Sequence, residues 1–325
     1  MRVLVTGGAG FIGSHLAARL NRRHSVAIID DLSGGYRRNV PDGVRFYGFD
    51  LTDHRNVDKV FALERPELVV HCAAYAAEGL SHWMRRYCFT QNLISWANLA
   101  NAAVDAGTHK IVVCSSMAVY GSQAPPFTED LAPHPEDPYG AAKAAMEADL
   151  WALAAVHGID VGVIRPHNVY GPRQNLADPY RNVVAIFMRQ ALAGDPITVH
   201  GSGEQVRAFS YIDDVAAAIV SLTEIDDIGT VNVGGETPIT INHLAELVKE
   251  ATGSDSPIVH LPERHEVDVA YCDHDRLRQL LGGWDPTPIE LGLERMAEWA
   301  RSIQIGPLRS YEYETTRNLF APWQR

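Results

Sequence analysis

The sequence has little positive charge and no long apolar run. Its 28 lysine and arginine residues stand against 40 aspartate and glutamate residues, which gives a formal net charge of −12. Nucleic acids and anionic membranes bind a basic face, so neither is expected as the main partner. No apolar run approaches the ~20 residues that a membrane-spanning helix needs. The first residues already resemble a core strand, so we expect no signal peptide and a cytoplasmic protein.

The sequence is also poor in cysteine. Cys72, Cys88, Cys114 and Cys272 are scattered, without a CxxC pair or a cluster with histidine. We interpret them as reduced, mostly buried thiols, and we expect no metal site. Apolar side chains are present in ordinary measure, because 46% of the 325 residues are hydrophobic and 21% are charged. This composition is typical of a globular protein, and the length allows a large core with two lobes.

A glycine-rich motif joins the first predicted strand to the first predicted helix. It reads Gly7-Gly8-Ala9-Gly10-Phe11-Ile12-Gly13. Gly7 allows a tight turn, Gly10 lets the backbone approach a pyrophosphate, and Gly13 lets the helix pack closely on the sheet. The amides at the start of the helix then face the negative charge of the phosphates. The motif therefore predicts a dinucleotide site.

Two acids follow the second predicted strand and indicate which dinucleotide binds. Asp30 lies at roughly the ~20-residue offset expected for a ribose-binding acid, and Asp31 is beside it. A carboxylate accepts hydrogen bonds from a free 2′-hydroxyl and repels a 2′-phosphate. The pair favours NAD over NADP.

Strands and helices alternate through the first half of the chain. Strands are expected at residues 44–49, 68–73, 110–115 and 160–164, with helices at 56–63, 82–106 and 139–157. This alternation predicts an α/β fold with a doubly wound parallel sheet of the Rossmann type.

Proline and glycine become frequent after Pro166, which indicates a smaller lobe. Helices are expected there at residues 213–222, 241–251, 275–281 and 290–302. We predict an NAD-binding domain at residues 1–167, with a strand and a helix contributed by residues 210–235. Residues 168–325 are then mainly a substrate-binding lobe at the carboxyl ends of the strands. The tail from Gly306 to Arg325 is irregular and aromatic, and its sequence indicates no role.

Three residues carry the predicted chemistry. Ser116 ends the strand at residues 110–115, and Tyr139 and Lys143 are four residues apart, on one face of a helix. A phenol, with a pKa near ~10, is a poor base at neutral pH. A neighbouring ammonium and a positive nicotinamide ring should lower the pKa of Tyr139. Ser116 would hydrogen-bond the substrate oxygen and relay its proton.

With these motifs the chain resembles the extended short-chain dehydrogenase/reductase family, and within it the nucleotide-sugar epimerases and dehydratases. The resemblance runs from Met1 to about Trp284. Besides the motifs above, it rests on Asp50-Leu51-Thr52, His71-Cys72-Ala73-Ala74, Ser115-Ser116, Tyr139-Gly140-Ala141-Ala142-Lys143, residues 165–173, Arg207 and residues 209–214.

The resemblance implies the residues of each site. Those implied for the cofactor are Gly7, Gly10, Phe11, Ile12, Gly13, Asp30, Asp31, Ser33, Asp50, Leu51, Ala73, Ala74, Asn92, Tyr139, Lys143 and His167. Those implied for a nucleotide-diphosphate sugar are Ser116, Asn168, Val199, Arg207 and Arg264. Glu78 is a further candidate for contacting sugar hydroxyls, because it stands where epimerases of the family often have a lysine. Arginine suits the substrate's diphosphate, because its planar fork of donors matches phosphate oxygens. A homodimer formed through the helices at residues 82–106 and 141–156 is also implied.

The two residues after Ser116 bear on the reaction. Sugar 4,6-dehydratases of the family carry an acid pair there, whereas this chain has Met117 and Ala118, which cannot transfer protons. The resemblance then implies a 4-epimerase: Tyr139 takes the proton of the 4-hydroxyl, hydride passes to NAD, and the 4-keto sugar turns before hydride returns.

Several alternatives stay open. The substrate pair is UDP-glucose and UDP-galactose, or UDP-glucuronate and UDP-galacturonate, in which case Arg173 or Arg181 could face the sugar carboxylate. A dehydratase or keto-reductase of the same family is a second possibility. A non-catalytic NAD-binding regulator is a third, although such proteins commonly lose the tyrosine or the lysine.

Overall fold

The computed structural model describes residues 1–180, 182–264, 266–320 and 323, and its centre is a seven-stranded sheet. The strand order is β11-β6-β5-β4-β1-β2-β3, and every neighbouring pair is parallel. The strands are β1 (Arg2–Thr6), β2 (Ser25–Ile29), β3 (Arg45–Tyr47), β4 (Leu68–His71), β5 (Lys110–Cys114), β6 (Asp160–Pro166) and β11 (Gly229–Val233). The predicted doubly wound α/β fold is confirmed.

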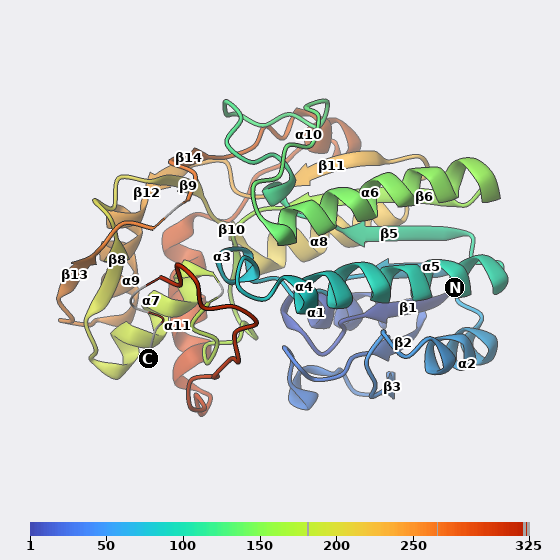
Figure 1. The fold of residues 1–325 in the computed structure, drawn as a ribbon, viewed down its shortest axis with the longest axis horizontal. Coiled ribbons are helices and arrows are strands. Elements are labelled where there is room, and N and C mark those ends of the chain that lie inside the picture. Colours follow the sequence, from blue (N-terminus) through green and yellow to red (C-terminus); the bar gives the residue numbers. More distant parts are fainter. Residues whose placement is uncertain (181, 265, 321–322, 324–325) are drawn as a thin grey trace.

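Helices cover both faces of this sheet (Figure 1). On one face, α2 (His54–Glu64), α5 (Ser95–Asp105) and α6 (Pro138–His157) pack against one another. On the other, α1 (Phe11–Leu20) packs against α8 (Ile212–Thr223). The core of the first face includes Phe61, Trp96 and Leu150, each at most 2% exposed. The two layers fix the strand ends, where ligands of such sheets bind.

Helix α6 begins and ends with strong local signals. The Asp137 side chain accepts hydrogen bonds from the backbone amides of Tyr139 and Gly140, at 2.8 and 3.0 Å. Pro138 is its first residue, where a missing N–H costs nothing. Gly158 ends it in the left-handed conformation, with φ +67°. The helix therefore starts at a defined residue, and this places Tyr139 in its first turn.

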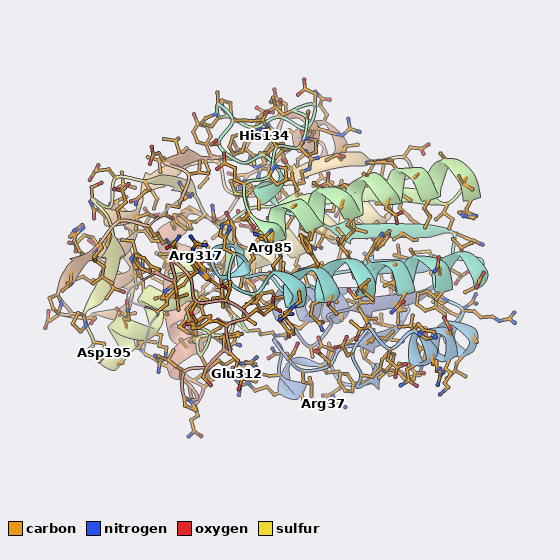
Figure 2. The ribbon with its side chains drawn as sticks, viewed as in Figure 1. Arg37, Arg85, His134, Asp195, Glu312 and Arg317 are labelled. Atoms are coloured by element: carbon orange, nitrogen blue, oxygen red, sulfur yellow. The ribbon has the colours of Figure 1, made fainter. Side chains whose placement is uncertain are left out.

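Residues after Asn168 add helices and short strands beyond the sheet. Helices α7 (Val183–Ala193), α9 (Ile241–Thr252) and α11 (Ile289–Arg301) pack together as a second lobe, whereas α10 (Asp275–Leu281) packs on β11 and α8 of the sheet domain. The short strands of this part of the chain are β7 (Val169–Tyr170), β8 (Ile197–His200), β9 (Val206–Ala208), β10 (Ser210–Tyr211), β12 (Pro238–Thr240), β13 (Ile258–Leu261) and β14 (Val269–Ala270). In Figure 2, Asp195 marks this lobe and Arg37 the sheet domain.

Two predictions about helices were wrong. The single helix expected at residues 82–106 is broken into α3 (Glu78–Ser81), α4 (Arg85–Phe89), a π-helical turn at Thr90–Ile94 and α5. The π turn shifts the hydrogen-bonding register, and the sequence pattern gives no sign of it. Helix α7 was missed, because its apolar run at residues 183–188 lies among the proline- and glycine-rich segments that predicted loops.

Among the described residues, no helix has the length and apolar character required to cross a membrane. All four cysteines carry free thiols. No group of histidine, cysteine and acidic side chains suited to a metal ion is found in the described part of the chain.

Candidate active site

A cavity of about 960 Å³ runs along the carboxyl ends of β1, β2, β4 and β5 into the second lobe. Most predicted site residues line it. These are Gly7, Gly10, Phe11, Ile12, Gly13, Asp30, Asp31, Ser33, Asp50, Leu51, Ala73 and Ala74 at one end, and Glu78, Ser116, Tyr139, Lys143, Asn168, Arg207 and Arg264 toward the other. The volume lies at the upper end of the range for small-molecule pockets, so there is room for a cofactor and a substrate.

The glycine loop forms a cradle that only glycine can form. Gly7 has φ +68°, and an added Cβ would lie 2.7 Å from the Ala73 nitrogen. A Cβ on Gly13 would lie 2.3 Å from the Gly7 carbonyl oxygen. The loop is therefore held against β4 and against the start of α1, with helix amides directed into the cavity. This geometry fits the pyrophosphate of a dinucleotide.

Asp30 lies beside this loop and helps to hold it. Its carboxylate accepts hydrogen bonds from the backbone amides of Ala9 and Leu32, at 2.9 and 2.8 Å. Burial raises the pKa of Asp30, while these two bonds lower it. Each carboxylate oxygen accepts more than one hydrogen bond, so Asp30 can also accept one from a ribose hydroxyl.

Ser116, Tyr139 and Lys143 meet on the floor of the cavity. Ser116 lies close enough to the Tyr139 phenol to lower its pKa, and the Ser116 hydroxyl accepts a hydrogen bond from the Ala118 amide at 3.1 Å. The Lys143 ammonium lies 5.9 Å from the Tyr139 ring centroid and donates a 2.7 Å hydrogen bond to the Cys114 carbonyl. Close packing of α6 on residues 117–119 fixes this arrangement, since a Cβ on Gly140 would lie 2.6 Å from the Ala118 carbonyl oxygen. The three groups can move a proton to or from one substrate hydroxyl.

Two charges are expected to lower the pKa of Tyr139, namely the Lys143 ammonium and the nicotinamide ring. In the protein alone, burial raises the pKa of the phenol, and Ser116 opposes that rise only in part. Burial also lowers the pKa of Lys143. The cost of placing a phenolate in a buried site is the part that the sequence does not show.

Glu78 lines the cavity close to Tyr139, and its surface is exposed there. Desolvation by the surrounding protein raises the pKa of Glu78 to about 7, with the charge of Asp137 adding to the rise. The charge of Glu78 in turn helps to raise the pKa of Tyr139. Glu78 thus changes charge near neutral pH, inside the site.

Arg207 and Arg264 lie together on the second-lobe side of the cavity. The Arg264 guanidinium pairs with Glu266 at 3.1 Å, and Arg207 lies 3.8 Å from the same carboxylate. Arg207 also donates to the carbonyls of Val206 and Asp268, at 2.9 and 3.0 Å. The structure brings together the two arginines predicted to hold a diphosphate, and both already have acceptors.

Polar atoms near the same end lack partners. Gln174 Oε1, His200 Nδ1 and Gln205 Oε1 are buried without a hydrogen-bond partner among the described residues, and all three side chains line the cavity. A buried polar group without a partner is costly. A polar ligand with donors and acceptors could satisfy these atoms.

Two predicted residues do not line the cavity, and those assignments are corrected. Val199 lies in β8, where side chains alternate, so it faces the core while Thr198 and His200 reach the cavity. The Asn92 amide is used inside the protein: it donates 2.8 Å to the Cys88 carbonyl and accepts from the Tyr75 amide at 3.2 Å. It supports the backbone next to the cavity instead.

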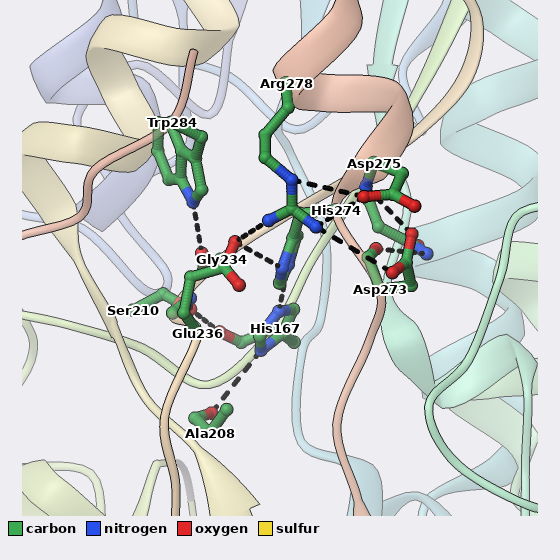
Figure 3. A network of polar contacts seen from close by, with 12 residues as sticks. His167, Ala208, Ser210, Gly234, Glu236, Asp273, His274, Asp275, Arg278 and Trp284 are labelled. Atoms are coloured by element: carbon green, nitrogen blue, oxygen red, sulfur yellow. Dashed lines mark hydrogen bonds and ion pairs between the residues drawn. The ribbon is translucent and has the colours of Figure 1, made fainter.

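His167 is a third correction. Its ring lies behind the cavity wall, 1% exposed, and its Nε2 is 2.9 Å from Nε2 of His274 (Figure 3). His274 in turn faces Glu236 at 3.3 Å. Burial lowers the pKa of His167 to about 4, so the ring is neutral. The neighbouring residues Pro166 and Asn168 line the cavity, so the sequence position was right but the side-chain direction was not.

Of the two arginines considered for a sugar carboxylate, the structure describes only Arg173. Arg173 does not line the cavity, and its guanidinium donates to the Ser14 carbonyl at 3.1 Å, against α1. Its left-handed backbone, with φ +70°, turns the side chain that way. Arg181 lies outside the described residues.

Sequence reasoning also missed some residues of the site. Cys72 and Cys114 follow β4 and end β5, line the cavity, and hold their sulfurs 3.4 Å apart. The C-terminal tail contributes a further set, namely Tyr311, Thr315, Arg317, Asn318, Phe320 and Trp323. The density of aromatic residues in the tail was the available signal, because exposed tails seldom keep such side chains.

Comparisons with known proteins agree with this geometry. The model of the NAD dependent epimerase/dehydratase family matches residues 3–234. A UDP-glucose 4-epimerase of Mycolicibacterium smegmatis is 35% identical over 315 residues, which cover 93% of this chain and 99% of that protein. UDP-glucuronic acid decarboxylase 1 of Danio rerio is 32% identical over 306 residues, 92% of this chain and 72% of that protein.

A solved structure of an epimerase is also similar to this chain. The UDP-glucose 4-epimerase of Thermus thermophilus, in complex with NAD, superposes with a TM-score of 0.87 at 36% identity. The match covers 93% of this chain and 99% of that structure.

Proposed function

Because the chain belongs to the NAD-dependent epimerase/dehydratase family, we propose that it is a nucleotide-diphosphate-sugar 4-epimerase. Its cofactor is NAD, and the substrates proposed are UDP-glucose and UDP-galactose, or UDP-glucuronate and UDP-galacturonate. One observation carries the proposal: Ser116 and Tyr139 line the same cavity as the glycine loop, with Lys143 one helical turn from Tyr139.

The reaction assigns one task to each of these side chains. Tyr139 removes the proton of the sugar 4-hydroxyl while Ser116 hydrogen-bonds the same oxygen. A bound NAD, held by the glycine loop and Asp30, would supply an acceptor for the hydride of C4 and a positive charge that favours the Tyr139 phenolate. The oxidised sugar, held by its diphosphate, would turn to present its other face, and Tyr139 would give the proton back as C4 is reduced. The net change is inversion at C4, and the cofactor is regenerated.

We also propose which residues hold the ligands. Gly7, Gly10, Gly13 and the adjoining helix amides bind the cofactor pyrophosphate, and Asp30 binds the adenine ribose. Arg207 and Arg264 hold the substrate diphosphate as the pivot for rotation, which suits their fork of donors. Asn168 and Glu78 contact the substrate on the sugar side.

Two other reactions on a 4-keto sugar are considered. Dehydration across C5 and C6 needs an additional acid and base, and Met117 and Ala118, which line the cavity after Ser116, supply neither. A uronate oxidised at C4 becomes a β-keto acid, which can lose carbon dioxide. The likeness to UDP-glucuronic acid decarboxylase 1 makes decarboxylation the second candidate.

The test is incubation of the NAD-loaded protein with UDP-glucose and, separately, UDP-glucuronate, followed by proton NMR of the sugar. Epimerisation predicts an equilibrium mixture at C4, with no lasting absorbance of reduced cofactor and no carbon dioxide. Loss of carbon dioxide from UDP-glucuronate would favour the decarboxylase. A lasting stoichiometric absorbance change would favour net oxidation or reduction. No change in either sugar would refute catalysis on these substrates.

Tyr139→Phe is the matched variant for this assay. It removes the one oxygen that accepts the proton and keeps the ring, so turnover should fall by at least ~100-fold, the lower range for a general acid–base group. The content of bound NAD should stay unchanged. Unchanged turnover would refute the role of Tyr139.

Three further proposals concern the whole molecule. Residues 1–167, with 210–235, form the NAD-binding domain, and residues 168–325 form mainly the substrate lobe. The protein works in the cytoplasm, where reducing conditions suit its free thiols. It forms a homodimer through the face of α5 and α6, where Ile94 and Trp151 are 52% and 40% exposed. Sedimentation of Trp151→Asp should then report monomers where the parent protein forms dimers.

A further inference from the structure

The last part of the chain lines the cavity. Residues 306–320 with Trp323, here named the C-terminal segment, follow α11 and have no helix or strand of their own apart from short turns. In Figure 1 this dark red segment passes in front of α7 and α11 and reaches α3 and α4 of the sheet domain. It therefore touches both lobes.

Hydrogen bonds hold the segment on the second-lobe side. They join the Arg309 amide to the Ala177 carbonyl at 2.8 Å, the Tyr311 hydroxyl to Asp178 at 2.7 Å, and the Tyr313 hydroxyl to that of Tyr180 at 2.7 Å. Ring contacts add to these bonds. The Phe320 ring meets His200 edge-on with centroids 5.1 Å apart.

A second set of contacts holds it on the sheet domain. The Glu314 carboxylate accepts hydrogen bonds from the backbone amides of Arg86 and Tyr87, both at 2.8 Å, in the first turn of α4. The Trp83 indole donates to the Arg317 carbonyl at 3.2 Å. These bonds use backbone groups at Arg317, so they set its position without using its guanidinium.

The segment places Arg317 at the cavity. Arg317 lines the cavity together with Arg207 and Arg264 (Figure 2 labels it between the two lobes). The other two arginines share the Glu266 carboxylate. Among the described residues no carboxylate lies within 4.0 Å of the Arg317 guanidinium. Within this part of the chain, Arg317 is thus a cation at the cavity whose charge no neighbouring acid neutralises.

We propose that Arg317 is a substrate-binding residue carried by the C-terminal segment, and that it binds an anionic group of the nucleotide sugar. This group is the diphosphate or a carboxylate on the sugar, since both offer oxygens that match the guanidinium fork. The inference rests on the proposed function for the identity of the ligand. In this proposal, the aromatic contacts of the C-terminal segment hold Arg317 next to the bound substrate.

The test is isothermal titration of the NAD-loaded, full-length protein with UDP, UDP-glucose and UDP-glucuronate. Arg317→Gln removes the charge at an exposed side chain, and Arg309→Gln is the matched control. Arg309 lies on the same segment, loses the same charge, and does not line the cavity. Arg317→Gln should weaken binding about tenfold, as expected for loss of one charge-assisted hydrogen bond. Arg317→Lys should recover part of the affinity, and Arg309→Gln should bind as the parent protein does.

The three ligands separate the two anionic groups. An equal loss for all three ligands assigns Arg317 to the diphosphate, whereas a loss for UDP-glucuronate alone assigns it to the sugar carboxylate. Unchanged affinity of Arg317→Gln for all three, or an equal loss in Arg309→Gln, overturns the inference. The proposed function is tested separately, by NMR of the sugar at C4. If the parent protein binds UDP but does not epimerise the sugar, the proposed function is refuted, and the titrations still test the role of Arg317.

Discussion

Replacement of Arg165 by methionine should destabilise the protein through one buried ion pair. Arg165 in β6 and Glu147 in α6 form a two-pronged pair, with N–O distances of 3.0 and 2.6 Å, and their side chains are only 4% and 5% exposed. Glu147 also accepts from the Ser115 hydroxyl, and Arg165 donates to the Tyr120 hydroxyl at 2.7 Å. The network therefore ties the end of β5, next to Ser116, to the helix that carries Tyr139.

The expected loss follows from the burial of the remaining charge. Removing one partner of a buried pair typically costs about 3–5 kcal/mol, because the other charge keeps its desolvation cost without its partner. Unfolding entropy near the midpoint is about 2.1 cal/mol/K per residue, or about 0.7 kcal/mol/K for 325 residues. Arg165→Met should then lower Tm by about 4–7 °C.

A double-mutant cycle measured by calorimetry separates the cost of the unpaired buried charge from the cost of lost side-chain packing. Glu147→Met with Arg165→Met removes both charges, so the double variant should be more stable than Arg165→Met alone. Arg278→Met is the surface control: Arg278 pairs with Glu236 at 2.6 Å, but both side chains are about a third exposed, and the cost should be at most about 1 kcal/mol. If the double variant is no more stable than the single one, burial of an unpaired charge does not explain the loss.

Four further predictions concern three residues of the ligand sites. Gly13→Ala should weaken NAD binding by about 5- to 160-fold, since its Cβ would meet the Gly7 carbonyl oxygen at 2.3 Å and overpacking costs about 1–3 kcal/mol. Gly306→Ala, with open space around it, is the control, and NAD content after purification is the measurement. Glu78 has a raised pKa of about 7, so it is neutral at pH 6 and anionic at pH 8. KM for an anionic nucleotide sugar should therefore rise from pH 6 to pH 8 in the parent protein and change less in Glu78→Gln. Equal pH profiles of KM in the two proteins would refute this role of Glu78. Because the pKa of Glu78 is raised in the folded protein, its protonation stabilises the fold at low pH, and this stabilisation is lost as pH rises through 7. Above pH 7, Glu78→Gln should therefore have a higher free energy of unfolding than the parent protein, as measured by urea titration. Asp31→Arg should improve NADP binding relative to NAD, measured by fluorescence titration, because it exchanges a repelling charge for an attracting one; an unchanged ratio would show that Asp31 does not face the 2′ position.

Local patterns in the sequence were enough to predict many of the residues that line the cavity. The glycine spacing, the acid after β2, and the tyrosine and lysine one helical turn apart depend on residues close in sequence, and each reaches the cavity. The parallel sheet follows from alternation of strands and helices, which is also local. Such features could be predicted because backbone geometry over a few residues decides them.

The sequence alone predicted the sheet and placed the glycine loop, Ser116, Tyr139 and Lys143 at the cavity, whereas the tertiary structure decided which way the remaining side chains face. Asn92, His167 and Val199 turn away from the cavity because contacts with Tyr75, His274 and the core of the second lobe take up their side chains. The C-terminal segment reaches the site through contacts with residues more than two hundred positions earlier, such as Glu314 with Arg86. No local pattern encodes such pairs, because they form only when the packed lobes bring the two surfaces together.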